Sequence, residues 1–200
     1  MAEKFIIEVY SEKKAEDLTA LIADPESKLE TGSAAACSMA FAMAFICRAA
    51  AVCRRDGVSG EELEYVERNA EHLRKYMIHL IDEDVRSRNP LRQAMKKGVE
   101  YEIDATRQPA VSVASEIVNM AGMGLDLANK LADICTEDAK PYLMQYAYTA
   151  MGAAKTAVSY IISMSSKSSD ETFRYVSKRQ HELMMQENEQ KFKKLTEKIN

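Results

Sequence analysis

Tryptophan is absent from the 200-residue sequence, and glycine and proline are scarce, with 7 and 4 residues. A β-sandwich or β-barrel needs many tight turns, so this scarcity argues against both architectures. Charge of one sign is not in large excess either, since 27 lysines and arginines accompany 31 aspartates and glutamates. With a net charge of −4 and only 7% aromatic residues, the composition argues against a nucleic-acid-binding protein.

Cysteine is also rare, and none of the four residues, Cys37, Cys47, Cys53 and Cys135, has the spacing of a zinc-ligand set. We expect free thiols in a reducing cytosol. The start of the sequence does not have the pattern of a signal peptide. The most apolar run, residues 34–47, is too short to span a bilayer and indicates a buried helix. The sequence therefore predicts a cytoplasmic protein that binds neither a membrane nor a metal.

Apolar residues recur every three or four positions along most of the chain, which is the spacing of one helix face. We expect an all-α protein, an antiparallel bundle of about six helices that forms a single domain over residues 1–200. The pattern predicts helices over 11–23, 31–55, 59–88, 90–98, 100–135, 136–164 and 170–198. The last of these is more polar than the others, so we expect it to be only partly packed. Residues 5–9 fit a short strand or a helical lead-in equally well.

Several residues predict where these helices begin, end or bend. Ser59 and Glu62 have the spacing of a capping box, which would open the third helix. Pro90 should end that helix and begin a short one, because proline is well placed in a first turn. Pro109 should bend or interrupt the long helix that follows. The segment 31–55 is rich in alanine, so neighbouring helices can approach it on nearly all sides, and we expect it to be the central helix.

Asp84 is the most informative polar residue. The predicted apolar stripe of the third helix runs through Val66, Ala70, Leu73, Met77, Leu80 and Ile81. One further turn brings the stripe to Asp84, which places a carboxylate on the face that the helix buries. A buried charge costs several kcal/mol unless it is paired, so Asp84 needs a partner, lines a cavity, or reaches solvent at the helix end. Asp82 falls on a different face, where we expect it to be solvated.

Other motifs carry weaker signals. His72 and His79 could share a helix face but lack a third metal ligand at suitable spacing. His181 is followed by glutamate, yet the second histidine of a zinc-protease helix is missing. Asp126 and Asp138 are most simply read as cap or solvated residues. No phosphate-binding loop, dinucleotide fingerprint or nucleophile elbow occurs.

Several short segments follow one another in a characteristic order. A turn with glycine and serine at residues 30–33 precedes an alanine-rich helix, and residues 80–84 read Leu-Ile-Asp-Glu-Asp. A proline followed by apolar and small residues stands at 109–114, an acidic pair at 137–138, and three small residues at 152–154. This pattern resembles the cyclodeaminase/cyclohydrolase family, which includes the deaminase domain of formiminotransferase-cyclodeaminase and the methenyltetrahydrofolate cyclohydrolases.

The resemblance implies an all-α homodimer with a folate site among its helices and a tetrahydrofolate derivative as substrate, without a metal or redox cofactor. It implies that Asp84 is the catalytic residue. A buried carboxylate can stabilise the cationic methenyl carbon and take a proton from attacking water. Gly32 and Ser33 would line the ligand at a helix N-terminus, where free N–H groups favour an anion. Asp82 and Asp138 are further ligand-binding candidates.

The sequence also departs from the family pattern. Glu30 and Thr31 stand where the family has two glycines, and their side chains could close or reshape the pocket. Thr156 and Tyr160 stand where the family has asparagines. Two alternatives to a folate enzyme therefore stay open. One is a diverged relative that binds a different small ligand without this activity, and the other is a helical interaction protein whose last helix meets a partner.

Overall fold

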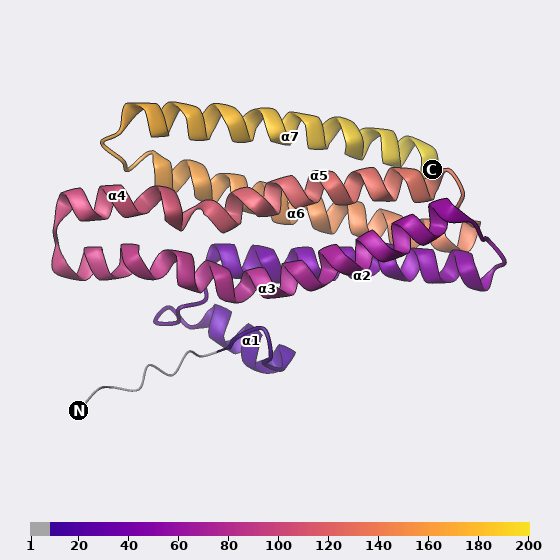
Figure 1. Ribbon diagram of the computed structural model, residues 1–200, viewed down its shortest axis with the longest axis horizontal. Helices are drawn as coiled ribbons and strands as arrows, with labels where there is room; N and C mark the ends of the chain where they lie inside the picture. The colour runs from indigo at the N-terminus through magenta and orange to yellow at the C-terminus, as the bar shows by residue number, and fades with distance from the viewer. Residues whose placement is uncertain (1–8) are drawn as a thin grey trace.

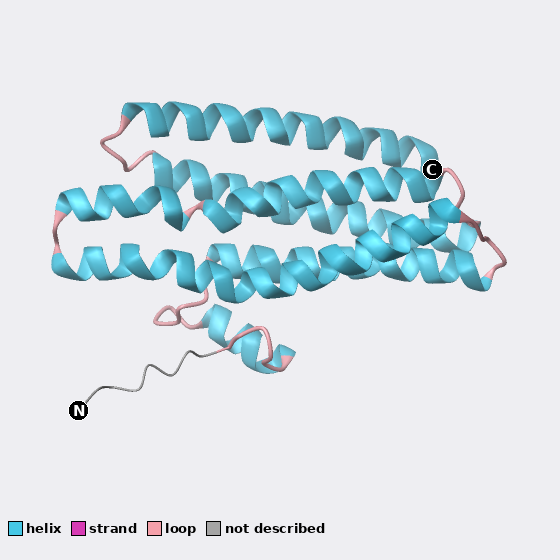
Figure 2. Ribbon diagram, viewed as in Figure 1, coloured by secondary structure: helices cyan, strands magenta, loops and turns pink. Residues whose placement is uncertain are grey.

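The structure, a computed structural model, describes residues 9–200, and these residues form helices and connecting loops without a strand (Figures 1 and 2). The helices are α1 (Ala15–Ala23), α2 (Thr31–Arg55), α3 (Glu61–Lys97), α4 (Glu100–Ala110), α5 (Ser112–Ala132), the short 3₁₀ helix η1 (Glu137–Ala139), α6 (Lys140–Ser165) and α7 (Glu171–Ile199). The prediction of an all-α protein is confirmed. The choice between strand and helix for residues 5–9 lies, except for Val9, outside the described residues.

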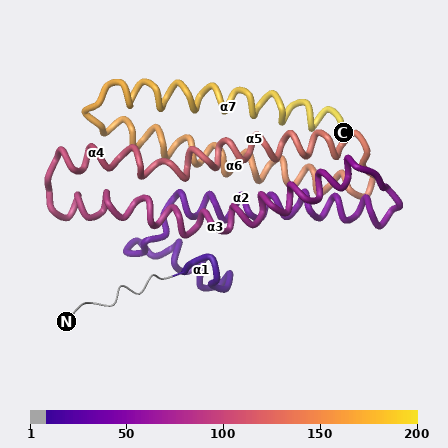
Figure 3. The backbone as a smooth tube through the Cα atoms, viewed as in Figure 1, coloured from indigo at the N-terminus to yellow at the C-terminus, as the bar shows by residue number. Residues whose placement is uncertain are grey.

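The helices α2 to α7 lie side by side along the long axis of the molecule, and successive long helices run in opposite directions (Figure 1). Helix α2 packs on α3, α5 and α6, and α7 packs on α5 and α6. The antiparallel bundle is therefore confirmed. The backbone trace shows that α1 is set apart from this bundle (Figure 3), and none of its residues is buried.

The core is built largely from small and flexible side chains. Several alanines on α2 and α6 are fully buried, and they let the backbones of these two helices approach each other closely. Met39, Met43 and Met77 fill the remaining space between helices. The largest fully buried side chain is Tyr146, whose hydroxyl donates a hydrogen bond to the carbonyl oxygen of Ala121 at 2.9 Å. That hydrogen bond satisfies the one polar group that this ring brings into the core.

The expectation that residues 31–55 form the central helix is wrong in part. Helix α2 is packed on one side, while its other side carries exposed residues such as Phe41, which is 61% exposed. Among residues 9–200, α2 is the helix long and apolar enough to cross a membrane by length and composition. Half of its apolar window is buried within the protein, and the core helices of soluble proteins have the same length and composition.

The predicted break at Pro90 does not occur. Helix α3 continues through Pro90 to Lys97 and ends at Gly98, which has the left-handed backbone (φ 71°) common at helix C-termini. Proline removes one backbone hydrogen bond inside a helix. Pro90 and Arg86, the residue one turn earlier, are both on the exposed side of α3, so the freed carbonyl oxygen can face water. The separate short helix predicted over 90–98 is therefore the last part of α3.

The predicted side-chain caps are also wrong in detail. Glu30 is the N-cap residue of α2 and Gly60 that of α3, and neither makes a side-chain capping hydrogen bond. The proposed capping box of Ser59 and Glu62 therefore does not cap α3. In contrast, Asp170, where the predicted last helix begins, does cap α7, because its side chain accepts a hydrogen bond from the backbone N–H of Phe173 at 3.0 Å.

The interruption near Pro109 is confirmed. Helices α4 and α5 meet at a single residue, Val111, whose backbone leaves the helical region at φ −102° and ψ 1°. Helix α5 then ends at Ala132, three residues before the predicted end at Cys135. Helix α7 is polar, as expected, and packs through one stripe that includes Ser177, Met185 and Leu195.

Gly124 on α5 has no room for a side chain, because a Cβ atom there would collide with the hydroxyl of Tyr146 and the methyl of Met43. We expect Gly124→Ala to lower the free energy of unfolding by about 1–3 kcal/mol through overpacking. Gly152 on α6 is the matched control, since nothing lies within 4 Å of its Cβ position. Gly152→Ala should raise the free energy of unfolding by roughly 0.5–1 kcal/mol. Urea denaturation measures both, and equal effects at the two positions would contradict this packing.

Candidate active site

Asp84 lies where the apolar stripe of α3 places it, on the buried face and with 0% of its surface exposed. One carboxylate oxygen, Oδ2, accepts two hydrogen bonds from Ser33, from the backbone N–H at 2.8 Å and from the hydroxyl at 2.8 Å. Ser33 lies in the first turn of α2, where backbone N–H groups have no partner within the helix. The N-terminus of α2 therefore stabilises the charge of Asp84.

Gly32 makes this close approach possible. A Cβ atom at Gly32 would overlap the carboxyl group of Asp84, so any side chain would push the carboxylate away from the start of α2. The structure thus brings together three of the residues that the sequence singled out, namely Gly32, Ser33 and Asp84. The solvent-exposed position at a helix end, which was the alternative for Asp84, is excluded by its burial.

Two arginines on α3 complete the surroundings of Asp84. Arg88 follows one turn later, and its Nη1 lies 3.8 Å from Asp84 Oδ2, while its Nη2 forms an ion pair with Glu30. Arg92, one further turn along, pairs with the same glutamate at 3.0 Å. We call Glu30, Asp84, Arg88 and Arg92 the carboxylate–arginine cluster. Its two negative and two positive charges sum to zero.

The arginines of the cluster were missed in the sequence. Asp84, Arg88 and Arg92 are spaced four residues apart, which places them on one helix face. This spacing is the sequence feature from which the cluster could be predicted. That signal was hidden by the predicted break at Pro90, which would have separated Arg92 from the others. The uninterrupted helix restores the alignment.

Several polar atoms around the cluster have no hydrogen-bond partner within residues 9–200. They are Asp84 Oδ1, Nε and Nη1 of Arg88, Nη1 of Arg92, and the hydroxyl of Tyr160. The Tyr160 ring lies 5.3 Å from the Arg88 guanidinium carbon. Burial raises the pKa of Asp84, and the hydrogen bonds from Ser33 oppose this shift without cancelling it. Burial likewise lowers the pKa of Arg88. Asp84 therefore has one oxygen fixed by Ser33 and one with free hydrogen-bonding capacity.

An open hollow of about 510 Å³ lies next to the cluster. It is formed by the start of α2 and the C-terminal half of α6, and it is lined by Thr31, Lys155, Thr156, Ser159, Tyr160 and Ser163. We call it the Tyr160 hollow, because Tyr160 also stacks on Arg88 and so connects the hollow to the cluster. Its lining is rich in hydroxyl groups and carries one ammonium group, so a polar ligand fits it better than an apolar one.

Asp82 and Asp138 lie away from this hollow. Asp82 is buried, contrary to the expectation that it is solvated, because it accepts hydrogen bonds from the backbone N–H of Tyr10 at 2.6 Å and from the hydroxyl of Ser11. It thereby fixes the chain before α1 to α3. The side chain of Asp138 is 74% exposed and lies 3.3 Å from Arg55, at the end of α2 opposite to Ser33. Because α2 has 25 residues, the two ends are about 37 Å apart.

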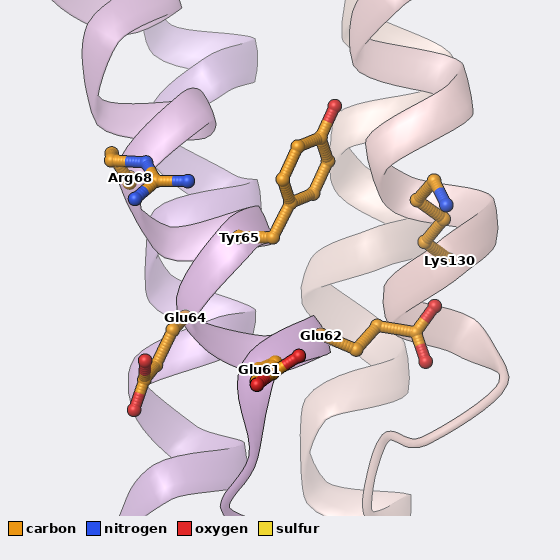
Figure 4. Close-up of a pocket in the computed structure, with 6 residues that line it drawn as sticks. All are labelled: Glu61, Glu62, Glu64, Tyr65, Arg68 and Lys130. Carbon is orange, nitrogen blue, oxygen red and sulfur yellow. The ribbon is translucent and has the colours of Figure 1, made fainter.

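A second open hollow, of about 570 Å³, lies at the start of α3 (Figure 4). Figure 4 shows Glu61, Glu62, Tyr65 and Arg68 on α3 and Lys130 on α5. Lys130 lies 5.7 Å from the centre of the Tyr65 ring. The hollow presents charged side chains and no buried carboxylate, so it lacks the feature that distinguishes the surroundings of Asp84.

The histidines and cysteines give no second site of comparable quality. His72 and His79 are exposed, and His181 is buried between Ser115 and the backbone of Ser177. All four cysteines are free thiols, as expected, although only Cys53 is fully buried. Within residues 9–200, no three His, Cys, Asp or Glu side chains lie close enough together to hold a metal ion.

Comparisons with known proteins find a match to one family profile and to solved structures. The sequence profile of the family described as formiminotransferase-cyclodeaminase matches residues 14–196. The crystal structure of formiminotetrahydrofolate cyclodeaminase from Thermotoga maritima superposes with a TM-score of 0.85 at 17% identity. That alignment covers 94% of this chain and 96% of the other. A search of curated protein sequences finds no match.

The raised pKa of Asp84 predicts how stability depends on pH. The folded protein holds the proton of Asp84 more tightly than the unfolded chain does, because the pKa of an aspartate in the unfolded chain is near 3.8. The contribution of Asp84 to stability is therefore greatest below that pH and declines as the pH rises through the folded-state pKa. The wild-type minus Asp84→Asn difference in the free energy of unfolding should fall as the pH rises from about 4 through the folded-state pKa of Asp84. A difference that rises with pH in urea denaturation would contradict the raised pKa.

Proposed function

The chain belongs to the formiminotransferase-cyclodeaminase family, and on that premise we propose that it is a folate-dependent one-carbon enzyme. It would act as a formiminotetrahydrofolate cyclodeaminase or as a methenyltetrahydrofolate cyclohydrolase. The observation that supports this proposal most is Asp84, a buried carboxylate at a helix N-terminus, one oxygen of which has no hydrogen-bond partner among residues 9–200. A carboxylate kept away from water in this way suits a reaction that forms or consumes a cation.

Both reactions pass through the same positively charged group. In the cyclodeaminase reaction, N10 of the folate attacks the carbon of the protonated formimino group. The formimino nitrogen takes up the proton that N10 loses and leaves as ammonia, and the carbon becomes the cationic methenyl bridge between N5 and N10. In the cyclohydrolase reaction, water adds to that bridge, one C–N bond breaks, and 10-formyltetrahydrofolate and a proton result. Asp84 Oδ1 would stabilise the cation by its charge.

Asp84 would also transfer the proton. The raised pKa of Asp84 makes its carboxylate a better base than an ordinary aspartate. Oδ1 would accept a proton from N10 or from the attacking water, while Ser33 holds Oδ2 in place. Gly32 and Ser33 are the proposed ligand-lining residues, since both lie in the first turn of α2 directly against the Asp84 carboxylate. We propose no part for Asp82 and Asp138 in this step, because they contact other residues away from the Asp84 carboxylate.

A substrate must open the cluster before it reaches Asp84, which has no exposed surface. Glu30 is the N-cap residue of α2, and its side chain is 41% exposed, so it can rotate into solvent more easily than Arg88. Thr31 lines the Tyr160 hollow beside it. We therefore expect substrate entry to require movement of Glu30, at one of the positions where the family has glycine.

A second candidate is a diverged relative that binds a different small ligand without turnover. The closed, charge-neutral cluster favours it, because Arg88 already pairs with the carboxylate that a cationic folate would need. Thr156 and Tyr160 also replace the asparagines of the family pattern.

A helical interaction protein has less support, since α7 packs on α5 and α6. From the family resemblance we also propose that the protein is cytoplasmic and forms a homodimer.

Turnover of the two folates tests the proposal directly. The purified protein should convert 5-formiminotetrahydrofolate to methenyltetrahydrofolate with release of ammonia, or hydrolyse methenyltetrahydrofolate, as followed by the absorbance of the methenyl group. Asp84→Asn should reduce the rate by at least about 100-fold, because the base and the negative charge are both lost.

Asp82→Asn is the matched control, since it neutralises a buried aspartate on the same helix that contacts Tyr10 and Ser11 instead of Ser33. Its rate should stay close to that of the wild type. Equal loss in both variants would mean that Asp84 has no special role. No turnover, with a folate-induced rise in melting temperature, would favour the diverged binding protein.

A further inference from the structure

The carboxylate of Glu30 is held by two guanidinium groups. Arg88 Nη2 pairs with Glu30 Oε2, and Arg92 Nη2 lies 3.0 Å from Glu30 Oε1. Arg92 Nη2 also donates to the carbonyl oxygen of Lys28, which fixes its position. Two arginines one helical turn apart therefore converge on the two oxygens of one anion, an arrangement that recognises carboxylates and phosphates in general.

Glu30 does not use all the donors that these arginines present. The Arg88 side chain is only 5% exposed, yet its Nε and Nη1 have no hydrogen-bond partner within residues 9–200. The Nη1 of Arg92 is buried and without a partner in the same region. Buried donors without acceptors are costly, so this site has capacity for more acceptor oxygens than one glutamate supplies.

The surroundings of the two arginines include an open hollow and one further carboxylate. The Tyr160 hollow lies beside the cluster, with Thr31 at the start of α2 and Lys155 on α6 among its lining residues. The carboxylate that also faces the arginines is Asp84, whose charge is already bound by Ser33. Glu30 is half-exposed and precedes α2, whereas Arg88 is buried, so Glu30 is the group that can leave.

We propose that Arg88 and Arg92 form a binding site for an external oxyanion, a carboxylate or phosphate group of a small molecule, and that Glu30 is the internal occupant which this ligand displaces. The site goes beyond the proposed function, because it holds for whichever small molecule enters the Tyr160 hollow. Glu30 then acts as a competitor within the chain and reduces the apparent affinity by the fraction of time that the site is closed.

Removing the competitor tests this site without any folate. Malonate and inorganic phosphate are the probes, titrated by isothermal calorimetry at constant ionic strength. Glu30→Gln keeps the size of the side chain and removes its charge, so it should bind at least one probe about tenfold more tightly than the wild type does. The preferred probe tells whether the site favours a carboxylate or a phosphate. The double variant Glu30→Gln/Arg92→Gln should lose this gain.

Glu67→Gln is the matched control, because it makes the same charge change by breaking the Arg54–Glu67 ion pair elsewhere on α2 and α3. It should bind the probes as the wild type does. Equal affinities for wild type and Glu30→Gln, or an equal gain in Glu67→Gln, would overturn the site. Should Glu30→Gln not fold, Glu30→Gly serves instead, since glycine is accepted at an N-cap. Folate turnover without anion binding would refute this inference alone, and anion binding without turnover would refute only the enzyme.

Discussion

The contact between the Asp84 carboxylate and the first turn of α2 determines how the rest of the site is arranged. It places a charge in the interior, which is tolerable because Ser33 donates two hydrogen bonds and the helix N-terminus is electropositive. It requires glycine at position 32, since no side chain fits between the carboxylate and α2. It also fixes the distance between the middle of α3 and the start of α2, where the Tyr160 hollow opens.

The cluster around this contact balances two opposing requirements. A buried aspartate that takes part in proton transfer needs a raised pKa and a free oxygen, and Asp84 has both. A stable fold needs buried charges to be paired, and Arg88 and Glu30 provide the pairing. The result is a closed arrangement in which the charges cancel. Several of its polar atoms have no hydrogen-bond partner within residues 9–200, which is uncommon for buried groups.

Local patterns predicted the helices and Asp84 well, because both follow from hydrophobic periodicity within one segment. They failed where the outcome depends on distant residues. The burial of Asp82 depends on Tyr10, 72 residues away in the sequence. The continuation of α3 depends on Pro90 facing water, which a general rule about proline does not reveal. With that rule, Arg92 could not be placed on the same face as Asp84.

A crystal structure with a bound, stable reduced folate, 5-formyltetrahydrofolate, tests most directly whether Asp84 is a reaction centre. We expect N10 of the bound folate to lie within hydrogen-bonding distance of Asp84 Oδ1, because its N–H can donate to that oxygen. We also expect the carboxylate of Glu30 to have moved away from Arg88. A folate bound elsewhere, with the contacts among Ser33, Asp84, Arg88 and Glu30 unchanged, would show that the buried carboxylate serves the fold and not a reaction.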